Sequence, residues 1–315
     1  MACKKILPYA KYFLVTLSIM PLGLMAFHFN SISYASEETD TKKLEDLVVK
    51  KTYETATEKT KNFLDPYFDH LELNMAGGEK RKPDGNLIGV IAYDNDGNKN
   101  SFFFNQLGLN RYDGRSTLNI GLGYRTLTDD DKWMFGANLF YDHEFPNDHQ
   151  RSSVGIEARS SVFNLSANTY NGISGYKSDR SGTDSKALGG NDAKLELSLP
   201  YLPETKLTYR AFKWNGIDGA SDSKGYTFGL KGYITENLLL ELGRTNFTGN
   251  SSAPSQDTMS LTYQIRFGEK KNNQFYLISN KAYEFKSLGD LRYEPVQREN
   301  RIIKQKKFAT TVSGV

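Results

Sequence analysis

The sequence predicts an all-β protein whose body is a transmembrane antiparallel β-barrel of about twelve strands. Three observations predict this fold. Apolar and polar residues alternate with a period of two from about residue 67 to residue 267. The alternating segments are about ten residues long, which is the length of a tilted strand that crosses a bilayer. Residues that favour turns separate the segments.

The composition fits a barrel and argues against a nucleic-acid partner. The net charge of +3 is too small to indicate binding to nucleic acid. The mean hydropathy of −0.56 does not exclude a membrane protein, because barrel strands combine apolar outward residues with polar inward ones. The 19 Tyr and 19 Phe residues suit a barrel with aromatic girdles, and they also suit a soluble β-protein.

Residues 1–35 have the pattern of a secretory signal peptide. Lysines precede an apolar run at residues 12–27, and the small residues Ser33 and Ala35 fit cleavage after Ala35. The alternative is a transmembrane anchor, but the run is shorter than the roughly 20 residues of a spanning helix and contains Pro21. We therefore expect secretion through the inner membrane and removal of this segment. The only cysteine lies within it, so we expect no disulfide in the mature chain.

Residues 36–64 are charged and rich in Thr. Leu44, Leu47 and Val48 fall at helical spacing, which predicts a short periplasmic helix and linker. A disordered tail is an equally good interpretation of this composition. The barrel is predicted to follow over residues 65–268.

The alternation within the barrel region is clearest at residues 118–125. One face there carries Leu118, Ile120, Leu122 and Tyr124, and the other carries Asn119, Gly121, Gly123 and Arg125. Similar segments lie at residues 133–141, 153–159, 163–168, 193–199, 207–211, 226–231, 238–243 and 259–267, with weaker ones at 67–75, 87–93 and 101–110.

A soluble β-sandwich would show the same alternation, with its apolar faces packed together. Three features favour the barrel. The segments exceed the roughly 5–6 residues of an ordinary soluble strand. The polar face is rich in Gly, Asn and Ser, which suits a wet lumen. Aromatic residues recur near segment ends, where the membrane interfaces would lie, at Tyr124, Tyr141, Tyr233 and Phe267.

The connections between segments have two lengths. Thr235-Glu236-Asn237 is short, whereas residues 178–191 and 246–256 are long and polar. Short turns at one end and longer loops at the other are typical of outer-membrane barrels.

Sequence blocks in the middle of the barrel region resemble the β-domain of the intimin and invasin family, the inverse autotransporters. Residues 107–125 read LGLNRYDGRSTLNIGLGYR, and residues 133–144 read WMFGANLFYDHE, close to the family's W-x-x-G-x-N-x-F-Y-D-H block. Residues 152–176 continue the likeness. The resemblance implies a twelve-stranded barrel in the outer membrane, in contact with its lipids. It also implies assembly by periplasmic chaperones and the barrel-assembly machinery.

Residues 269–315 are predicted to form a linker and a short C-terminal tail, and residues 292–302 resemble that family's linker signature. The resemblance implies a linker that passes through the barrel pore to a surface-exposed adhesive passenger. The matching signature residues are Arg292, Tyr293, Val296, Arg298, Asn300 and Ile302. Pro295 and Glu299 depart from the signature. The sequence ends soon afterwards, at Val315, so we expect the passenger to be absent, truncated or a separate polypeptide.

Charged residues of the polar face are candidates for lining the lumen: Arg125, Glu157, Arg159, Glu196, Arg210 and Arg266. They could pair with one another in water, or they could hold the linker, whose exposed amides need partners inside a pore. The sequence leaves both roles open. We also hypothesise that Arg298 and Asn300 anchor the linker inside the barrel.

No segment of the sequence predicts a catalytic, cofactor or metal site. Asp142-His143-Glu144 looks like a cluster of ligands, but neighbouring residues of a strand point to opposite faces and cannot converge without a turn. A structural role at a strand end is the simpler interpretation. Serines near the histidines lack a nucleophile motif such as G-x-S-x-G, so we do not expect an enzyme.

The residues and the resemblance together predict an outer-membrane translocator that exports and anchors a C-terminal adhesin passenger. A host-cell or surface receptor would be a partner if a passenger exists. The alternative is a small plugged pore or a structural outer-membrane barrel without a passenger. The linker signature favours the first, and the missing passenger favours the second.

Overall fold

The computed structural model describes residues 67–77, 84–95, 98–112, 114–179, 182–235, 237–248, 254–267 and 278–307. The predicted signal peptide and the predicted helix and linker at residues 36–64 lie outside the described residues. The chain divides into two units, Met1–Asp69 and His70–Val315, and every strand named below belongs to the second. Within the described residues, no helix is long and apolar enough to span a membrane.

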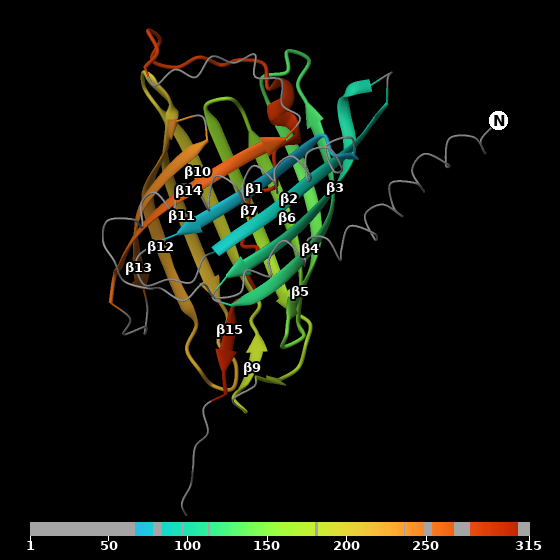
Figure 1. Ribbon diagram of the computed structural model, residues 1–315, viewed down its shortest axis with the longest axis vertical. Helices are drawn as coiled ribbons and strands as arrows, with labels where there is room; N and C mark the ends of the chain where they lie inside the picture. Colours follow the sequence, from blue (N-terminus) through green and yellow to red (C-terminus); the bar gives the residue numbers. More distant parts are fainter. Residues whose placement is uncertain are drawn as a thin grey trace, which may run out of the picture. The chain divides into compact units, whose positions relative to one another are not determined.

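Twelve antiparallel strands close into a barrel in the described part of the chain (Figure 1). They are β1 (His70–Gly77), β2 (Asp84–Asn95), β3 (Asn98–Tyr112), β4 (Arg115–Leu127), β5 (Met134–Phe145), β6 (His149–Arg159), β7 (Phe163–Gly172), β10 (Gly190–Leu199), β11 (Leu202–Trp214), β12 (Ser223–Thr235), β13 (Leu238–Thr248) and β14 (Gln256–Phe267). β1 pairs with β14, with Leu71 opposite Phe267, and this pairing leaves the sheet without a free edge. The predicted twelve-stranded barrel is confirmed.

The two faces of the strands have the exposures that a membrane barrel requires. In β4, Ile120, Leu122 and Tyr124 point outward and are 41–45% exposed. The alternate residues Asn119 and Arg125 are buried in the interior. Outward apolar side chains recur on the other strands, and they form the surface that contacts lipid.

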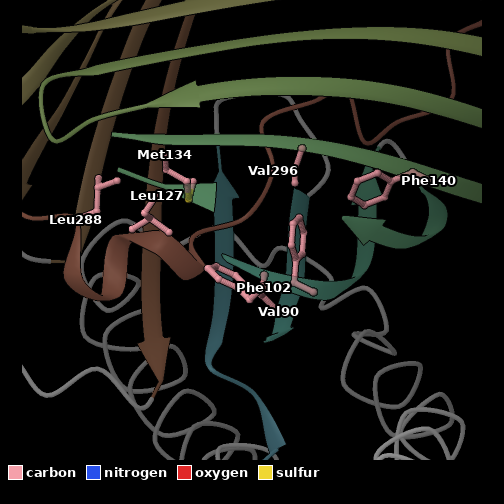
Figure 2. Close-up of a cluster of buried hydrophobic side chains, with 8 residues drawn as sticks. Val90, Phe102, Leu127, Met134, Phe140, Leu288 and Val296 are labelled. Atoms are coloured by element: carbon pink, nitrogen blue, oxygen red, sulfur yellow. The ribbon is translucent and has the colours of Figure 1, made fainter. Parts of the chain in front are cut away.

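The interior also contains a cluster of apolar side chains, which the sequence pattern did not separate from the polar face. The cluster consists of Val90, Phe102, Phe104, Leu127, Met134 and Phe140 from the barrel wall and Leu288 and Val296 from the C-terminal segment (Figure 2). Met134 and Phe140 were placed on the polar face by the alternation, and both are fully buried. Apolar side chains are suited to these inward positions because they pack against the C-terminal segment and do not face a water-filled lumen.

The connections at the two ends of the barrel differ in length. At one end, strands are joined by residues 96–97, 128–133, 160–162, 200–201 and 236–237. At the other end, the connections between β3 and β4 and between β5 and β6 are also short, whereas residues 173–189 and 215–222 form the longest connections between barrel strands. Residues 178–191 were expected to be one long loop, but the structure places β9 (Asp184–Ala187) there, after β8 (Lys177–Ser178). β9 forms because it pairs with β15 (Lys304–Lys306), a strand from the distant C-terminal segment.

Gly121 faces the interior directly opposite Phe140. A methyl group added at Gly121 would overlap the ring of Phe140, which is fully buried. We expect Gly121→Ala to lower the free energy of unfolding by about 1–3 kcal/mol, the usual cost of overpacking. Urea unfolding in lipid vesicles would measure the change, with Gly175→Ala as the control because Gly175 has open space beside it. Equal effects of the two substitutions would argue against this packing.

Candidate functional site

The candidate site is the interior of the barrel, where the C-terminal linker, residues 288–307, runs through it. The linker starts at Leu288 and the 3-10 helix η2 (Gly289–Tyr293), continues as an extended chain and leads into β15. η2 and β15 lie at opposite ends of the barrel (Figure 1). Between them, Val296 and Ile302 are only 3% and 1% exposed. The linker therefore crosses the barrel and is enclosed by it.

Arginine side chains of the barrel bind the linker backbone near η2. Arg125 donates a hydrogen bond from Nη1 to the carbonyl oxygen of Arg292 at 2.7 Å. Arg159 donates to the carbonyl oxygens of Leu291 and Pro295 at 3.3 and 3.1 Å. These donors satisfy backbone groups for which an extended chain has no partners of its own.

Signature residues near η2 also contact the barrel through their side chains. The guanidinium of Arg292 lies 3.3 Å from the carboxylate of Asp131, in the turn between β4 and β5. The ring centroid of Tyr293 lies 5.6 Å from that of Phe102 on β3. The start of the linker is thus fixed by charge and by aromatic packing.

The middle of the linker is bound by side chains from β3, β4, β6 and β7. Gln106 accepts a hydrogen bond from the N–H of Val296 at 2.8 Å. The hydroxyl of Tyr170 accepts one from the N–H of Glu299 at 2.7 Å. Three linker carbonyl oxygens accept hydrogen bonds, that of Gln297 from Asn168, that of Glu299 from Arg151 and that of Asn300 from Asn119. The barrel wall is therefore a binding groove for an extended chain.

The most buried ion pair of the linker joins Arg298 to Asp142 of β5. The two oxygens of Asp142 accept hydrogen bonds from the Arg298 guanidinium at 2.8 and 2.7 Å, and both side chains are 0% exposed. Arg151 donates to the same carboxylate at 2.9 Å. The guanidinium carbon of Arg298 lies 4.3 Å from the ring centroid of Phe140. A two-point contact of this kind fixes the direction as well as the position of the arginine.

Glu299, which departs from the family signature, joins a second network of ion pairs. Arg210 donates to Glu299 at 3.1 Å from Nη1 and to Asp192 at 2.6 Å from Nη2. Arg301 donates to the other oxygen of Glu299 at 2.8 Å. The glutamate connects the linker to β10 and β11, so its carboxylate has a specific role in this chain.

At the β15 end, side chains and strand pairing hold the linker together. Lys304 donates to Glu144 of β5 at 2.7 Å. The side chain of Gln305 exchanges two hydrogen bonds with the backbone of Ile217, in the connection between β11 and β12. β15 then adds to β9 and β8 as a three-stranded sheet.

The structure brings all six candidate lumen charges to the interior face. Five of them contact the linker directly: Arg125 contacts Arg292, Arg159 contacts Leu291, Glu196 contacts Gln297, Arg210 contacts Glu299 and Arg266 contacts Glu294. Glu157 pairs with Arg125 and Arg159 instead. The two roles that the sequence left open therefore coexist, because these side chains pair with one another and also hold the linker.

Sequence reasoning missed the barrel residues that make many of these contacts: Gln106, Asn119, Asp142, Glu144, Arg151, Asn168 and Tyr170. Asp142 and Glu144 point into the interior and bind the linker, whereas His143 points outward, 3.3 Å from Asp148. The period-two alternation predicts that both carboxylates point into the interior, since it places them on the inward face of β5.

The two residues that we hypothesised to anchor the linker, Arg298 and Asn300, contact the barrel in different ways. Arg298 binds Asp142 through its side chain, whereas Asn300 contacts the barrel through its carbonyl oxygen. We expect Arg298→Ala to raise single-channel conductance in planar bilayers, because the linker loses its buried ion pair. Asn300→Ala keeps the backbone contact and should change conductance little. Unchanged conductance in Arg298→Ala would count against the anchoring role.

Comparison with known proteins matches this barrel and linker to one family model. The model described as "Inverse autotransporter, beta-domain" matches residues 25–300. A solved structure, reported under the name "Unveiling the Mechanism Behind the in-meso Crystallization of Membrane Proteins", has a TM-score of 0.62 at 22% identity. It covers 76% of this chain and 99% of that chain. This likeness shows that the two chains share a fold.

Several curated proteins are similar to part of the chain. Invasin of Yersinia enterocolitica is 30% identical over 220 residues, which are 67% of this chain and 26% of invasin. Intimin of Escherichia coli O127:H6 is 25% identical over 251 residues, which are 76% of this chain and 26% of intimin. The putative attaching and effacing protein homolog of Escherichia coli K12 is 28% identical over 185 residues, 58% of this chain and 61% of that protein. The matched region is thus about a quarter of the length of invasin and intimin.

Proposed function

The chain belongs to the inverse autotransporter β-domain family, and from this we propose that its barrel exports a C-terminal passenger through the pore and anchors it at the cell surface. The barrel itself is an outer-membrane translocator of the inverse autotransporter type, surrounded by membrane lipid. In this proposal residues 1–35 are a cleaved signal peptide, and periplasmic chaperones and the barrel-assembly machinery insert the barrel. The passenger is an adhesin that binds a host-cell or surface receptor, and the relatives named invasin and intimin support that part.

The observation that carries the proposal is a linker bound along its whole path through the barrel. It is held near η2 by Arg125, in the middle by Asp142 and at the β15 end by Glu144. A chain that has been exported and must remain attached needs such contacts, because they keep it from sliding in the pore. At the β15 end the linker forms an edge strand of a small three-stranded sheet.

The connections between strands support one direction for the linker. The longest connections between consecutive barrel strands, residues 173–189 and 215–222, lie at the β15 end, where the β3–β4 and β5–β6 connections are short. In outer-membrane barrels the short turns face the periplasm and the longer loops face the outside of the cell. This pattern supports a linker that enters from the periplasm and leaves at the cell surface.

A second candidate function is a partly plugged pore without a passenger. We propose no catalytic role for the barrel, whether it is a translocator or a pore. One observation favours it, a cavity of about 1900 Å³ that remains inside the barrel beside the linker. The cavity shows that the linker does not fill the barrel completely. The dense set of contacts to the linker supports the translocator more strongly.

An epitope tag fused after Val315, carried by the whole chain in cells with an outer membrane, tests the export proposal. We expect antibody to label the tag on intact cells, while a periplasmic protein stays unlabelled as the control for leakage. Labelling that requires broken cells would contradict export and favour the plugged pore.

A further inference from the structure

The linker packs its apolar side chains against one part of the barrel wall, and a polar cavity remains beside it. Leu288 and Val296 pack against β2, β3, β4 and β5. The cavity of about 1900 Å³ is lined by the linker, by residues 278–287, by β1, β2 and β3, and by strands β10–β14. Its lining reaches Tyr112 near the β15 end and Ser279 near the η2 end, so small solutes can approach it from the barrel mouths.

Three lysines from three neighbouring strands line this cavity around one carboxylate. The Nζ atoms of Lys194, Lys231 and Lys206 lie 2.8, 3.6 and 3.9 Å from the Glu196 carboxylate. Lys206 of β11 stands directly opposite Lys231 of β12. Two like charges at opposed positions destabilise a sheet, and a bound anion would relieve that repulsion. The lysine side chains are 22–32% exposed, so their ammonium groups remain accessible from the cavity.

Two buried hydroxyl groups lie beside these lysines. Ser166 is directly opposite Lys194, and Ser198 is directly opposite Lys206. The serines are 1% and 3% exposed and line the same cavity. Neither hydroxyl forms a hydrogen bond with any residue that the structure describes. Because buried hydroxyls normally have a partner, these two are available to donate to a bound oxygen atom.

Other carboxylates also attract these lysines, but they form no ion pair with them in the described part of the chain: Glu241 and Glu294 act on Lys231, and Glu294 acts on Lys206. Glu241 lies opposite Lys231 and accepts a hydrogen bond from Ser260 at 3.4 Å. Glu204 also lines the cavity. In the described part of the chain, the ion pairs of all three lysines are with Glu196. Three ammonium groups therefore share one close carboxylate.

We infer that this lysine recess, formed by Lys194, Lys206, Lys231, Ser166 and Ser198, binds a small oxyanion of the phosphate class. A tetrahedral oxyanion presents several acceptor oxygens, and ammonium and hydroxyl groups are donors that match them. The recess lies in the cavity beside the linker, and Glu196 at its centre also accepts a hydrogen bond from the side chain of Gln297 in the linker at 2.9 Å. The site does not depend on export, and its failure would leave the translocator proposal unchanged.

Isothermal titration of the full chain in a nonionic detergent tests the recess, with inorganic phosphate as the probe in a gluconate buffer. The native chain should bind phosphate saturably. The double substitution Lys206→Gln and Lys231→Gln should weaken binding at least about tenfold, since a hydrogen bond to a charged group contributes about that factor. The double substitution Lys206→Arg and Lys231→Arg keeps both charges and should retain binding. Heat-modifiable migration in gels would verify that each variant is folded.

The matched control is a second lysine pair on the same two strands. Lys213 stands directly opposite Lys224, and both side chains are exposed on the outer face. The double substitution Lys213→Gln and Lys224→Gln should leave phosphate binding unchanged. The inference would be overturned by an absence of saturable binding to the native chain, or by equal losses in the two glutamine variants.

Discussion

Replacing Asp142 with alanine is expected to lower the free energy of unfolding by about 3–5 kcal/mol. The Asp142 carboxylate pairs with the guanidinium groups of Arg298 and Arg151, and all three side chains are 0% exposed. Its removal would leave two buried cations without their counter-charge, and losses of that kind are among the largest that one substitution causes. Urea unfolding of the purified chain in lipid vesicles would measure the change.

Asp257→Ala is the matched control for this substitution. Asp257 lies 3.6 Å from Arg244, and both side chains are exposed. Exposed ion pairs contribute little to stability, so the control should unfold nearly as the native chain does. A loss at Asp142 no larger than the loss at Asp257 would mean that the buried ion pair does not stabilise the barrel and linker.

Replacing Val296 with aspartate is expected to displace the linker from the barrel wall. Val296 is 3% exposed within the apolar cluster, and an unpaired carboxylate there would cost several kcal/mol (Figure 2). We expect the linker to move and the wall to stay, because the wall is held by continuous strand pairing. Single-channel conductance in planar bilayers should rise, and the displaced linker should become sensitive to protease.

Val296→Ala provides the comparison for that experiment. It removes two methyl groups from the same position but buries no charge, so we expect conductance close to that of the native chain. Native conductance and protease resistance in Val296→Asp would show that the apolar cluster does not position the linker.

The barrel could be predicted from the sequence because the outward face of every strand contacts lipid. Each strand therefore has apolar residues at alternate positions, and this pattern can be recognised strand by strand. Residues 118–125 alone predicted a strand, with Ile120 on one face and Arg125 on the other. The structure places Ile120 outward and Arg125 inward. No knowledge of distant residues was needed for that step. The same local rule defined most of the other strands.

The groove that binds the linker could not be predicted in this way, because its two sides are far apart in the sequence. Asp142 and Arg298 are 156 residues apart, and Gln106 and Val296 are 190 residues apart. The family resemblance marked Arg298 and Val296. The alternation can place Asp142 and Gln106 on inward faces, but it does not indicate which linker residue each of them binds. Phe140 illustrates the difficulty, since an inward aromatic side chain makes physical sense only once the linker packs on it.

The short strand β9 illustrates the same limit at the β15 end. Residues 184–187 are polar and look like part of a loop, and they become a strand because β15 arrives from the linker to pair with them. Local propensity is weak there, and the pairing partner decides the structure.

In the proposed function, the linker crosses the barrel from the η2 end, in the periplasm, to the β15 end, outside the cell. Single-cysteine labelling on intact cells with a membrane-impermeant maleimide tests it most directly, in a Cys3→Ser background. Lys281 precedes η2, Lys307 follows β15, and both are exposed. We predict that Lys307→Cys is labelled on intact cells and that Lys281→Cys is labelled only after the outer membrane is opened. Labelling of Lys281→Cys on intact cells, with Lys307→Cys protected, would contradict the account.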